Sequence, residues 1–137
     1  MRAPEYPRST ASKFRLLYLG NDLEFITALR QELNEPIYLL VACSDKGGAV
    51  LFLKSDIPYD LMLIDLDWRG KEGLELARLA QSLEHRKEMP IVMVSATKLK
   101  SAMKTMARKA GVKRCLMKKT DVGAVIRQLV ETAPGES

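Results

Sequence analysis

The chain is expected to fold as one α/β domain, in which five βα units form a doubly wound parallel sheet with helices on both faces. The first observation is the apolar run at 61–64, which leads directly into Asp65. Such a run is typical of a parallel strand that is covered on both faces. The second observation is that strand-like runs alternate with helix-like patterns along the chain, an order that right-handed crossovers assemble into a parallel sheet.

The composition is ordinary for a globular protein, with 137 residues, 47% hydrophobic and 28% charged. No apolar run approaches the roughly 18 residues of a membrane span, and the N-terminus lacks the apolar core of a secretory signal. We therefore expect a cytoplasmic protein without a membrane contact. We also expect a flexible leader at 1–13, one domain at 14–132 and a flexible tail at 133–137.

Capping residues and proline divide the first half of the chain. Residues 21–24 have the N-x-x-E form of a capping box, so a helix is expected to begin at Asn21. Pro36 ends this helical pattern. Ser44 or Asp45 can cap a second helix, which reaches about residue 55. The strands expected here are 14–19, 37–43 and 61–65.

Helices are also expected after the third, fourth and fifth strands. Met103, Met106 and Ala107 recur at helical spacing and define a core face. Gly111 then supplies a C-terminal stop, and Asp121 can cap the last helix. The elements expected here are helices over 72–84, 99–110 and 121–130, and strands over 91–94 and 114–117.

The sequence holds two cysteines and one histidine. Cys43 and Cys115 have no spacing typical of a metal or redox motif, so we interpret both as small core residues. His85 follows a helix among charged residues. We interpret it as a solvated cation at a helix end rather than as a catalytic group.

Polar residues follow the carboxyl ends of four expected strands, at the edge where open α/β sheets bind ligands. They are Asn21, Asp65 and its neighbour Asp67, Ser95 and Lys118.

With these residues in place, the chain resembles the receiver domains of two-component response regulators over 14–131. The matching segments are D-L-M-L-I-D, which ends at Asp65 and is followed by Gly73, then P-I-V-M-V-S-A with Ser95, and A-G-V-K-R-C-L-M-K with Lys118. The resemblance implies a flavodoxin- or CheY-like sheet of strand order 2-1-3-4-5. It therefore also places the cysteines on opposite edge strands.

The resemblance implies a signalling role rather than an enzymatic one. Asp65 would accept a phosphoryl group from a histidine kinase or phosphotransfer protein. Lys118 would pair with the phosphoryl oxygens as a compact point charge. Ser95 would rotate inward to hydrogen-bond the phosphorylated acid.

One departure from the family concerns the metal site. The family has adjacent acids after the first strand that hold a divalent cation, whereas this chain has Gly20 and Asn21. Magnesium prefers carboxylates, and phosphoryl transfer to a carboxylate needs the cation. Asp65 and Lys118 alone sum to no net charge. We therefore expect Mg²⁺ binding by Asn21, Asp65 and Asp67 to be weak or absent.

Three further residues bear on this pocket. Asp22 is interpreted as a favourable charge in a first helical turn, although Asp22 or Asp67 could partly restore the metal site. Arg69 stands where many receivers carry proline. Cys115 replaces the family's aromatic switch residue, so the usual relay from Ser95 is not expected to operate.

Residues 98–119 contain nine lysines and arginines and no acid. Lys100, Lys104 and Arg108 share one helical face, where like charges repel. The stretch is either a solvated surface or the contact for a protein partner or a homodimer, since receivers use this region as their output face. No aromatic residue interleaves the cations, so nucleic acid is not favoured.

We interpret the chain as a receiver domain that acts through protein contacts and has a degenerate pocket. The alternative is a phosphorylation-independent pseudo-receiver, with a nucleic-acid-binding adaptor less favoured. A haloacid-dehalogenase-like phosphatase is suggested by the D-x-D at Asp65 and Asp67. It is not favoured, because the D-x-D of that family follows its first core strand.

Overall fold

The computed structural model describes residues 14–33, 37–69 and 71–131, so the leader and tail expected at the chain ends lie outside the described residues. A parallel sheet of five strands runs through the centre in the order β2-β1-β3-β4-β5. The expected strand order is confirmed. The strands are β1 (Phe14–Leu19), β2 (Tyr38–Cys43), β3 (Leu61–Asp65), β4 (Ile91–Ser95) and β5 (Arg114–Met117).

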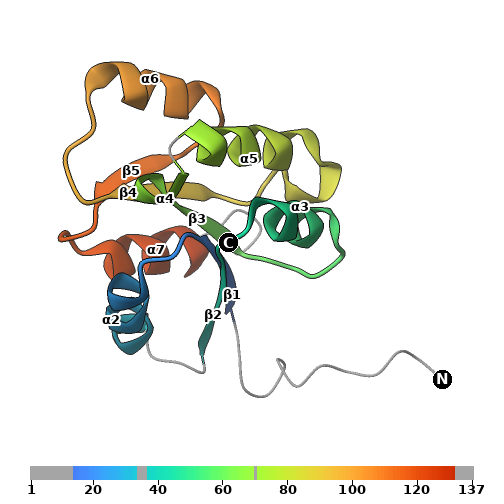
Figure 1. The fold of residues 1–137 in the computed structure, drawn as a ribbon. Helices are drawn as coiled ribbons and strands as arrows, with labels where there is room; N and C mark the ends of the chain where they lie inside the picture. Colours follow the sequence, from blue (N-terminus) through green and yellow to red (C-terminus); the bar gives the residue numbers. More distant parts are fainter. Residues whose placement is uncertain (1–13, 34–36, 70, 132–137) are drawn as a thin grey trace.

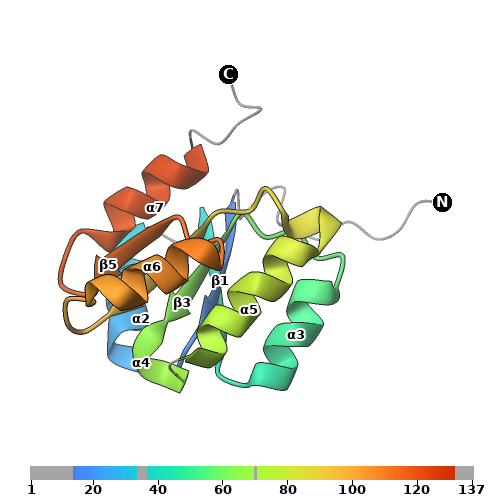
Figure 2. The same cartoon turned by 90° about the horizontal axis from the view of Figure 1, so that it is seen from above.

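Helices cover both faces of the sheet, as Figures 1 and 2 show. One face carries α2 and α7, and the other carries α3, α5 and α6. The helices are α2 (Leu23–Leu33), α3 (Lys46–Lys54), α4 (Leu66–Arg69), α5 (Lys71–Ser82), α6 (Ser101–Lys109) and α7 (Val122–Glu131), with a 3₁₀ turn, η1 (Glu84–Arg86). Among the described residues, no helix is long and apolar enough to cross a membrane.

The central strand β3 is buried along its whole length, as its apolar run predicted. Because side chains alternate along a strand, Met62 and Ile64 pack under α3, α5 and α6, whereas Leu61 and Leu63 pack under α2 and α7. Asp65 continues the second set and is itself buried. The sheet therefore directs the Asp65 carboxylate towards the side of α2 and α7.

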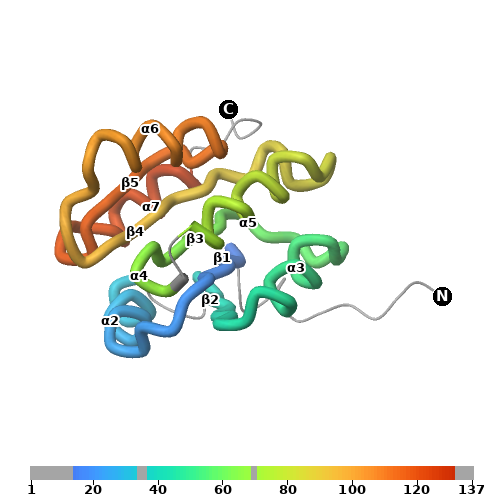
Figure 3. The backbone as a smooth tube through the Cα atoms, turned by 45° about the horizontal axis from the view of Figure 1, so that its top comes forward, coloured from blue at the N-terminus to red at the C-terminus, as the bar shows by residue number. Residues whose placement is uncertain are grey.

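Two helix starts differ from the expectation. The backbone N–H of Phe25 donates to Asp22 Oδ1 at 3.0 Å, so α2 is capped by Asp22 and not by Asn21. The short helix α4, which was not expected, follows β3 directly and lies beside the connection from β1 to α2 (Figure 3). Trp68 is buried in the core and anchors this helix. Asp45 caps α3 through Gly48 N, one of the two expected caps.

The cysteines are free and lie on opposite edge strands, as expected. Cys43 is buried, while Cys115 is only half-buried, so the expectation of a core residue holds fully for Cys43 alone. On α6, Ala107 is buried and Met103 and Met106 pack against the core. The opposite face, with Lys104 and Arg108, is exposed.

The end of α3 is closed by residues of η1. The buried Arg86 guanidinium donates to the carbonyl oxygens of Phe52, Leu53 and Ser55 at 2.9 to 3.0 Å. A positive group is favourable at a helix C-terminus, where carbonyl groups lack helical partners. His85 is exposed, as expected at a helix end, and its Nε2 lies 2.9 Å from the Ser55 carbonyl oxygen.

The contact between α5 and β3 yields a stability prediction. A Cβ atom at Gly73 would lie 2.6 Å from Ile64 Cγ2, which is too close for two carbon atoms. Gly73→Ala should therefore lower the free energy of unfolding by about 1 to 2 kcal/mol, because overpacking outweighs the gain in helix propensity. Urea denaturation measures the change. Gly47→Ala, at an exposed glycine of α3, serves as the control and should leave stability unchanged or slightly higher; equal effects at both sites would contradict the packing argument.

Candidate functional site

The carboxyl ends of β1, β3, β4 and β5 meet at one edge of the sheet, and Lys118 is the centre of that edge. Its Nζ lies 2.8 Å from Asp22 Oδ2, 2.9 Å from Asp65 Oδ2 and 3.0 Å from Asp67 Oδ2. Its side chain is 12% exposed and that of Asp65 is 1% exposed. One ammonium group thus pairs with three carboxylates from the ends of β1 and β3.

Backbone hydrogen bonds fix both partners of the central pair. The N–H of Lys118 donates to the Ser95 carbonyl oxygen at 2.8 Å, which extends the pairing of β5 with β4 by one step. The N–H of Asp67 donates to Asp65 Oδ1 at 2.9 Å. These bonds hold Lys118 and Asp65 in place before any ligand arrives.

Tyr18 is a residue of this pocket that the sequence argument missed. Its hydroxyl donates to Asp65 Oδ2 at 2.6 Å and accepts from the N–H of Asp22 at 3.2 Å. Burial, and then the hydrogen bond to Asp65, raise the pKa of Tyr18 far above its ordinary value, so the hydroxyl stays protonated. The alternation of side chains along a strand could have identified Tyr18 from the sequence. Tyr18 and Asp65 occupy positions of β1 and β3 that face the same side of the sheet.

Gly20 is required by the position of Tyr18. A Cβ atom at Gly20 would lie 2.6 Å from Tyr18 Cζ and 2.7 Å from Asp65 Cβ, and it would also clash with the Tyr18 hydroxyl. Residue 20 therefore cannot carry an acid while the tyrosine ring lies beneath it. The absence of the family's acid at this position is coupled to the presence of Tyr18.

The expected charge count of the pocket was wrong. Asp65 and Lys118 alone sum to zero, but Asp22 and Asp67 also contact Lys118, which leaves two net negative charges. Asn21, the expected metal ligand, is exposed. Asp22 fulfils its expected role in the first turn of α2 and adds the ion pair with Lys118.

The pocket does not fit a bound magnesium ion. Within the described parts of the chain, no group of three or more His, Cys, Asp or Glu side chains is placed to hold a metal. Each of the three carboxylates instead contacts the Lys118 ammonium, at 2.8 to 3.0 Å. No chemical step is therefore derived through the ion.

Ser95 is buried at the end of β4, and its hydroxyl bonds to the loop that follows this strand. It donates to the carbonyl oxygen of Thr97, within the connection that leads to α6. The structure therefore places Ser95 next to the pocket without joining it to the ion-pair cluster. Its expected inward rotation stays a prediction.

Contacts within the cluster shift the pKa values of Asp22 and Lys118. The hydrogen bond from Lys118, and then the N–H of Phe25, lower the pKa of Asp22 below its ordinary value of 3.8. Burial alone would lower the pKa of Lys118, but its hydrogen bonds to Asp22, Asp65 and Asp67 outweigh this and raise it. The net shifts of Asp22 and Lys118 both favour the charged forms at neutral pH.

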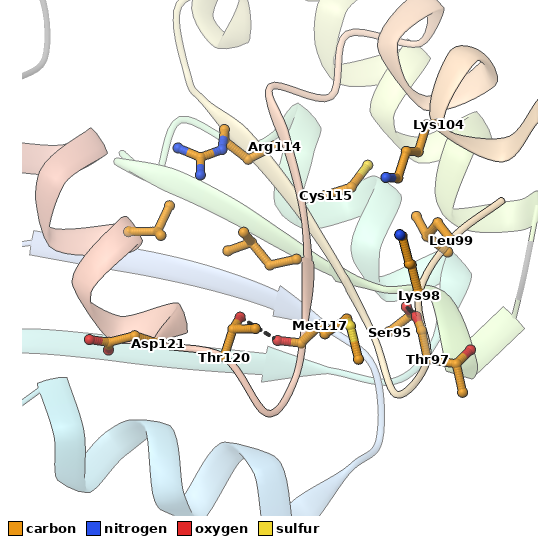
Figure 4. A pocket seen from close by; sticks show the side chains of 12 residues that line it. Ser95, Thr97, Lys98, Leu99, Lys104, Arg114, Cys115, Met117, Thr120 and Asp121 are labelled. Atoms are coloured by element: carbon orange, nitrogen blue, oxygen red, sulfur yellow. Dashed lines mark hydrogen bonds between the residues drawn. The ribbon is translucent and has the colours of Figure 1, made fainter. Parts of the chain in front are cut away.

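An open groove of about 580 Å³ lies beside the pocket, between α6 and α7 over the edge strand β5. Figure 4 shows Cys115 facing Lys104 on one side of β5, with Ser95 and Met117 where the groove meets the pocket. Arg114 and Lys98 also line it, and both are exposed. The groove thus combines an apolar floor with a basic rim.

Comparison with known proteins identifies the fold family. Residues 19–130 match the sequence profile of the response regulator receiver domain. The chain belongs to this family. A comparison with curated proteins finds no match.

Solved receivers share the fold at low sequence identity. The signal receiver domain of the DNA binding response regulator protein (merR) from Colwellia psychrerythraea 34H is 21% identical with a TM-score of 0.74, over 87% of this chain and 99% of that one. The receiver domain protein (CheY-like) from Methanospirillum hungatei JF-1 is 21% identical with a TM-score of 0.71, over 88% and 93% of the two chains.

A third solved receiver carries a metal. The receiver domain of the sensor histidine kinase PA1611 from Pseudomonas aeruginosa PAO1 has magnesium coordinated in its active-site cleft; it is 20% identical with a TM-score of 0.68, over 88% of this chain and 96% of that one. Receiver domains of this family are signalling modules of two-component systems, and they interact with histidine kinases or phosphotransfer proteins.

The close packing of Gly20 against Tyr18 in this receiver predicts how much stability is lost when an acid is introduced at residue 20. Gly20→Asp alone should cost about 2 to 4 kcal/mol of stability, because the new side chain collides with the Tyr18 ring. In a Tyr18→Val background the same change should cost at least about 1 kcal/mol less. Urea denaturation of the four proteins in this double-mutant cycle gives both values. Additive effects would show that Tyr18 does not exclude the acid.

The low pKa of Asp22 predicts a pH dependence of stability. A carboxylate whose pKa is depressed in the folded receiver stabilises it above the unfolded-state value near 3.8, and this contribution is lost as the pH falls further. Asp22→Asn keeps an oxygen that can accept from Phe25 N but cannot take up a proton. The wild type should therefore exceed the variant in stability at pH 7, and the difference should shrink below about pH 4. A difference that is independent of pH would contradict the ion pair with Lys118.

Proposed function

We propose that this receiver domain signals through protein contacts and that phosphorylation of Asp65 does not control it. The supporting observation is that both oxygens of the Asp65 carboxylate already have partners. Tyr18 and Lys118 bind Oδ2, and the N–H of Asp67 binds Oδ1. A carboxylate that attacks a phosphorus atom must give up part of this hydrogen bonding, and Tyr18 lies against the same oxygen that Lys118 contacts.

The chemistry of phosphoryl transfer also supports this proposal. The transferred group carries negative charge on its equatorial oxygens, and a bound cation normally neutralises that charge. In the described pocket, the Lys118 ammonium is shared among three carboxylates, so two negative charges remain uncompensated. An incoming phosphoryl donor would meet net repulsion.

The basic surface beside the groove is the contact that we propose for a protein partner. Lys98, Lys104 and Arg114 line the groove and are exposed. Cys115, on its floor, lacks the aromatic ring with which other receivers report activation, so the surface is suited to constitutive contact. Charge complementarity favours an acidic partner and affects mainly the rate and specificity of association.

The runner-up function is a receiver that a histidine kinase or phosphotransfer protein still modifies at Asp65. The position of Asp65 at the end of β3, with Lys118 2.9 Å away, favours this alternative. Such a partner would have to displace the Tyr18 hydroxyl and bring a cation into the pocket. A second copy of the chain docked through 98–119 would satisfy either function.

Phosphorylation tests the proposal directly. Wild-type protein incubated with acetyl phosphate and magnesium should show little or no added phosphoryl group by intact-mass spectrometry. Beryllofluoride should leave the amide spectrum unchanged, because we expect weak or no binding of the metal on which that anion depends.

Asp65→Asn is the control for specificity, since it removes the acceptor oxygen and keeps the shape of the side chain. Robust labelling of the wild type that disappears in Asp65→Asn would overturn the proposal and favour the runner-up. Labelling that persists in the variant would show that a residue other than Asp65 is phosphorylated.

A further inference from the structure

We propose that the Asp67 carboxylate is a resident anion, which occupies the place that a phosphoryl group or a free inorganic oxyanion would need in this pocket. Asp67 Oδ2 accepts the N–H of Ala96 at 2.8 Å and lies 3.0 Å from Lys118 Nζ. These two donors come from the ends of neighbouring strands, β4 and β5. An ammonium and a backbone N–H aimed at the same oxygen form an anion site.

The position of Asp67 is imposed by its neighbours in the chain. Its N–H donates to Asp65 Oδ1, which fixes the backbone two residues beyond the end of β3. Trp68 is buried in the core on the other side of α4. The carboxylate of Asp67 is therefore held over the pocket, although its side chain is 41% exposed.

A phosphoryl group attached to Asp65 would compete with Asp67 for the same donors. Its oxygens would have to approach Lys118, where the Asp67 oxygen already lies at 3.0 Å. A phosphoryl oxygen at this position would repel the Asp67 carboxylate at close range. The inference rests on the proposed function, because it explains why the pocket has no need of an external phosphoryl group.

The hydrogen bond between Asp67 and Ala96 also connects the pocket to the groove. Ala96 lies between Ser95 and Thr97, both of which line the groove, and the Ser95 hydroxyl donates to the carbonyl oxygen of Thr97. Asp67 thus ties the start of the connection between β4 and α6 to the pocket. The groove edge is held in one arrangement without an added ligand.

The test compares two variants of the full chain by ¹⁵N NMR during titration with inorganic phosphate and no metal. Asp22→Asn removes one competing charge from Lys118 and keeps the cap of α2. The double variant Asp22→Asn/Asp67→Ala also removes the resident anion. The Ala96 amide should shift saturably with phosphate in the double variant and at least about tenfold more weakly in Asp22→Asn. Lys118→Met added to the double variant should abolish the response.

A second measurement does not depend on phosphate binding. The Ala96 amide should exchange with solvent faster in Asp67→Ala than in the wild type, because its hydrogen bond is lost. Equal phosphate responses in the two Asp22 variants, or an Ala96 amide that is unaffected by loss of Asp67, would overturn the inference. Labelling of the wild type by acetyl phosphate would instead overturn the proposed function, so the two failures are distinguishable.

Discussion

The arrangement of this pocket depends on keeping the charge of Asp65 compensated at the buried end of β3. An isolated carboxylate there would lose most of its hydration, at a cost of several kcal/mol even after relaxation. Lys118 supplies an opposite charge, Tyr18 donates a hydroxyl and Asp67 donates its backbone N–H. Each group that satisfies Asp65 also fills space or neutralises charge that a ligand would otherwise use. The remaining features of the site follow from this.

The substitutions that set this receiver apart therefore form a set. Tyr18 can lie beneath residue 20 only because that residue is glycine, and its hydroxyl also receives the N–H of Asp22. Asp22 in turn contributes a carboxylate to Lys118. Reverting one of these positions would leave a clash or an unpaired group. The loss of the family's acids after β1 is thus a reorganisation of the pocket rather than the deletion of two ligands.

Buried apolar runs and helical periodicity are local signals, and they predicted the strands and helices of the sheet. The strand order came from the resemblance to receiver domains. The sequence did not predict α4, because a helix of 4 residues is too short to show helical periodicity, and only the folded core shows that Trp68 anchors it. It named Asn21 rather than Asp22 as the cap because residues 21–24 have the N-x-x-E form of a capping box. The choice is decided by the ion pair between Asp22 and Lys118, which are 96 positions apart. The same holds for the contact of Asp67 with Ala96, which only the folded sheet brings together.

A ligand can shift a conformational equilibrium only by the difference between its affinities for the two states. In a receiver with an open acidic pocket, a metal and a phosphoryl group gain new contacts on binding and so provide that difference. In this pocket, the Lys118 ammonium already meets the carboxylates, and the Asp67 carboxylate already meets Lys118 and the Ala96 N–H. An added ligand would exchange existing contacts for equivalent ones and gain little. Under the proposed function, the internal ion pairs hold the groove in one persistent state instead of a phosphate-driven switch.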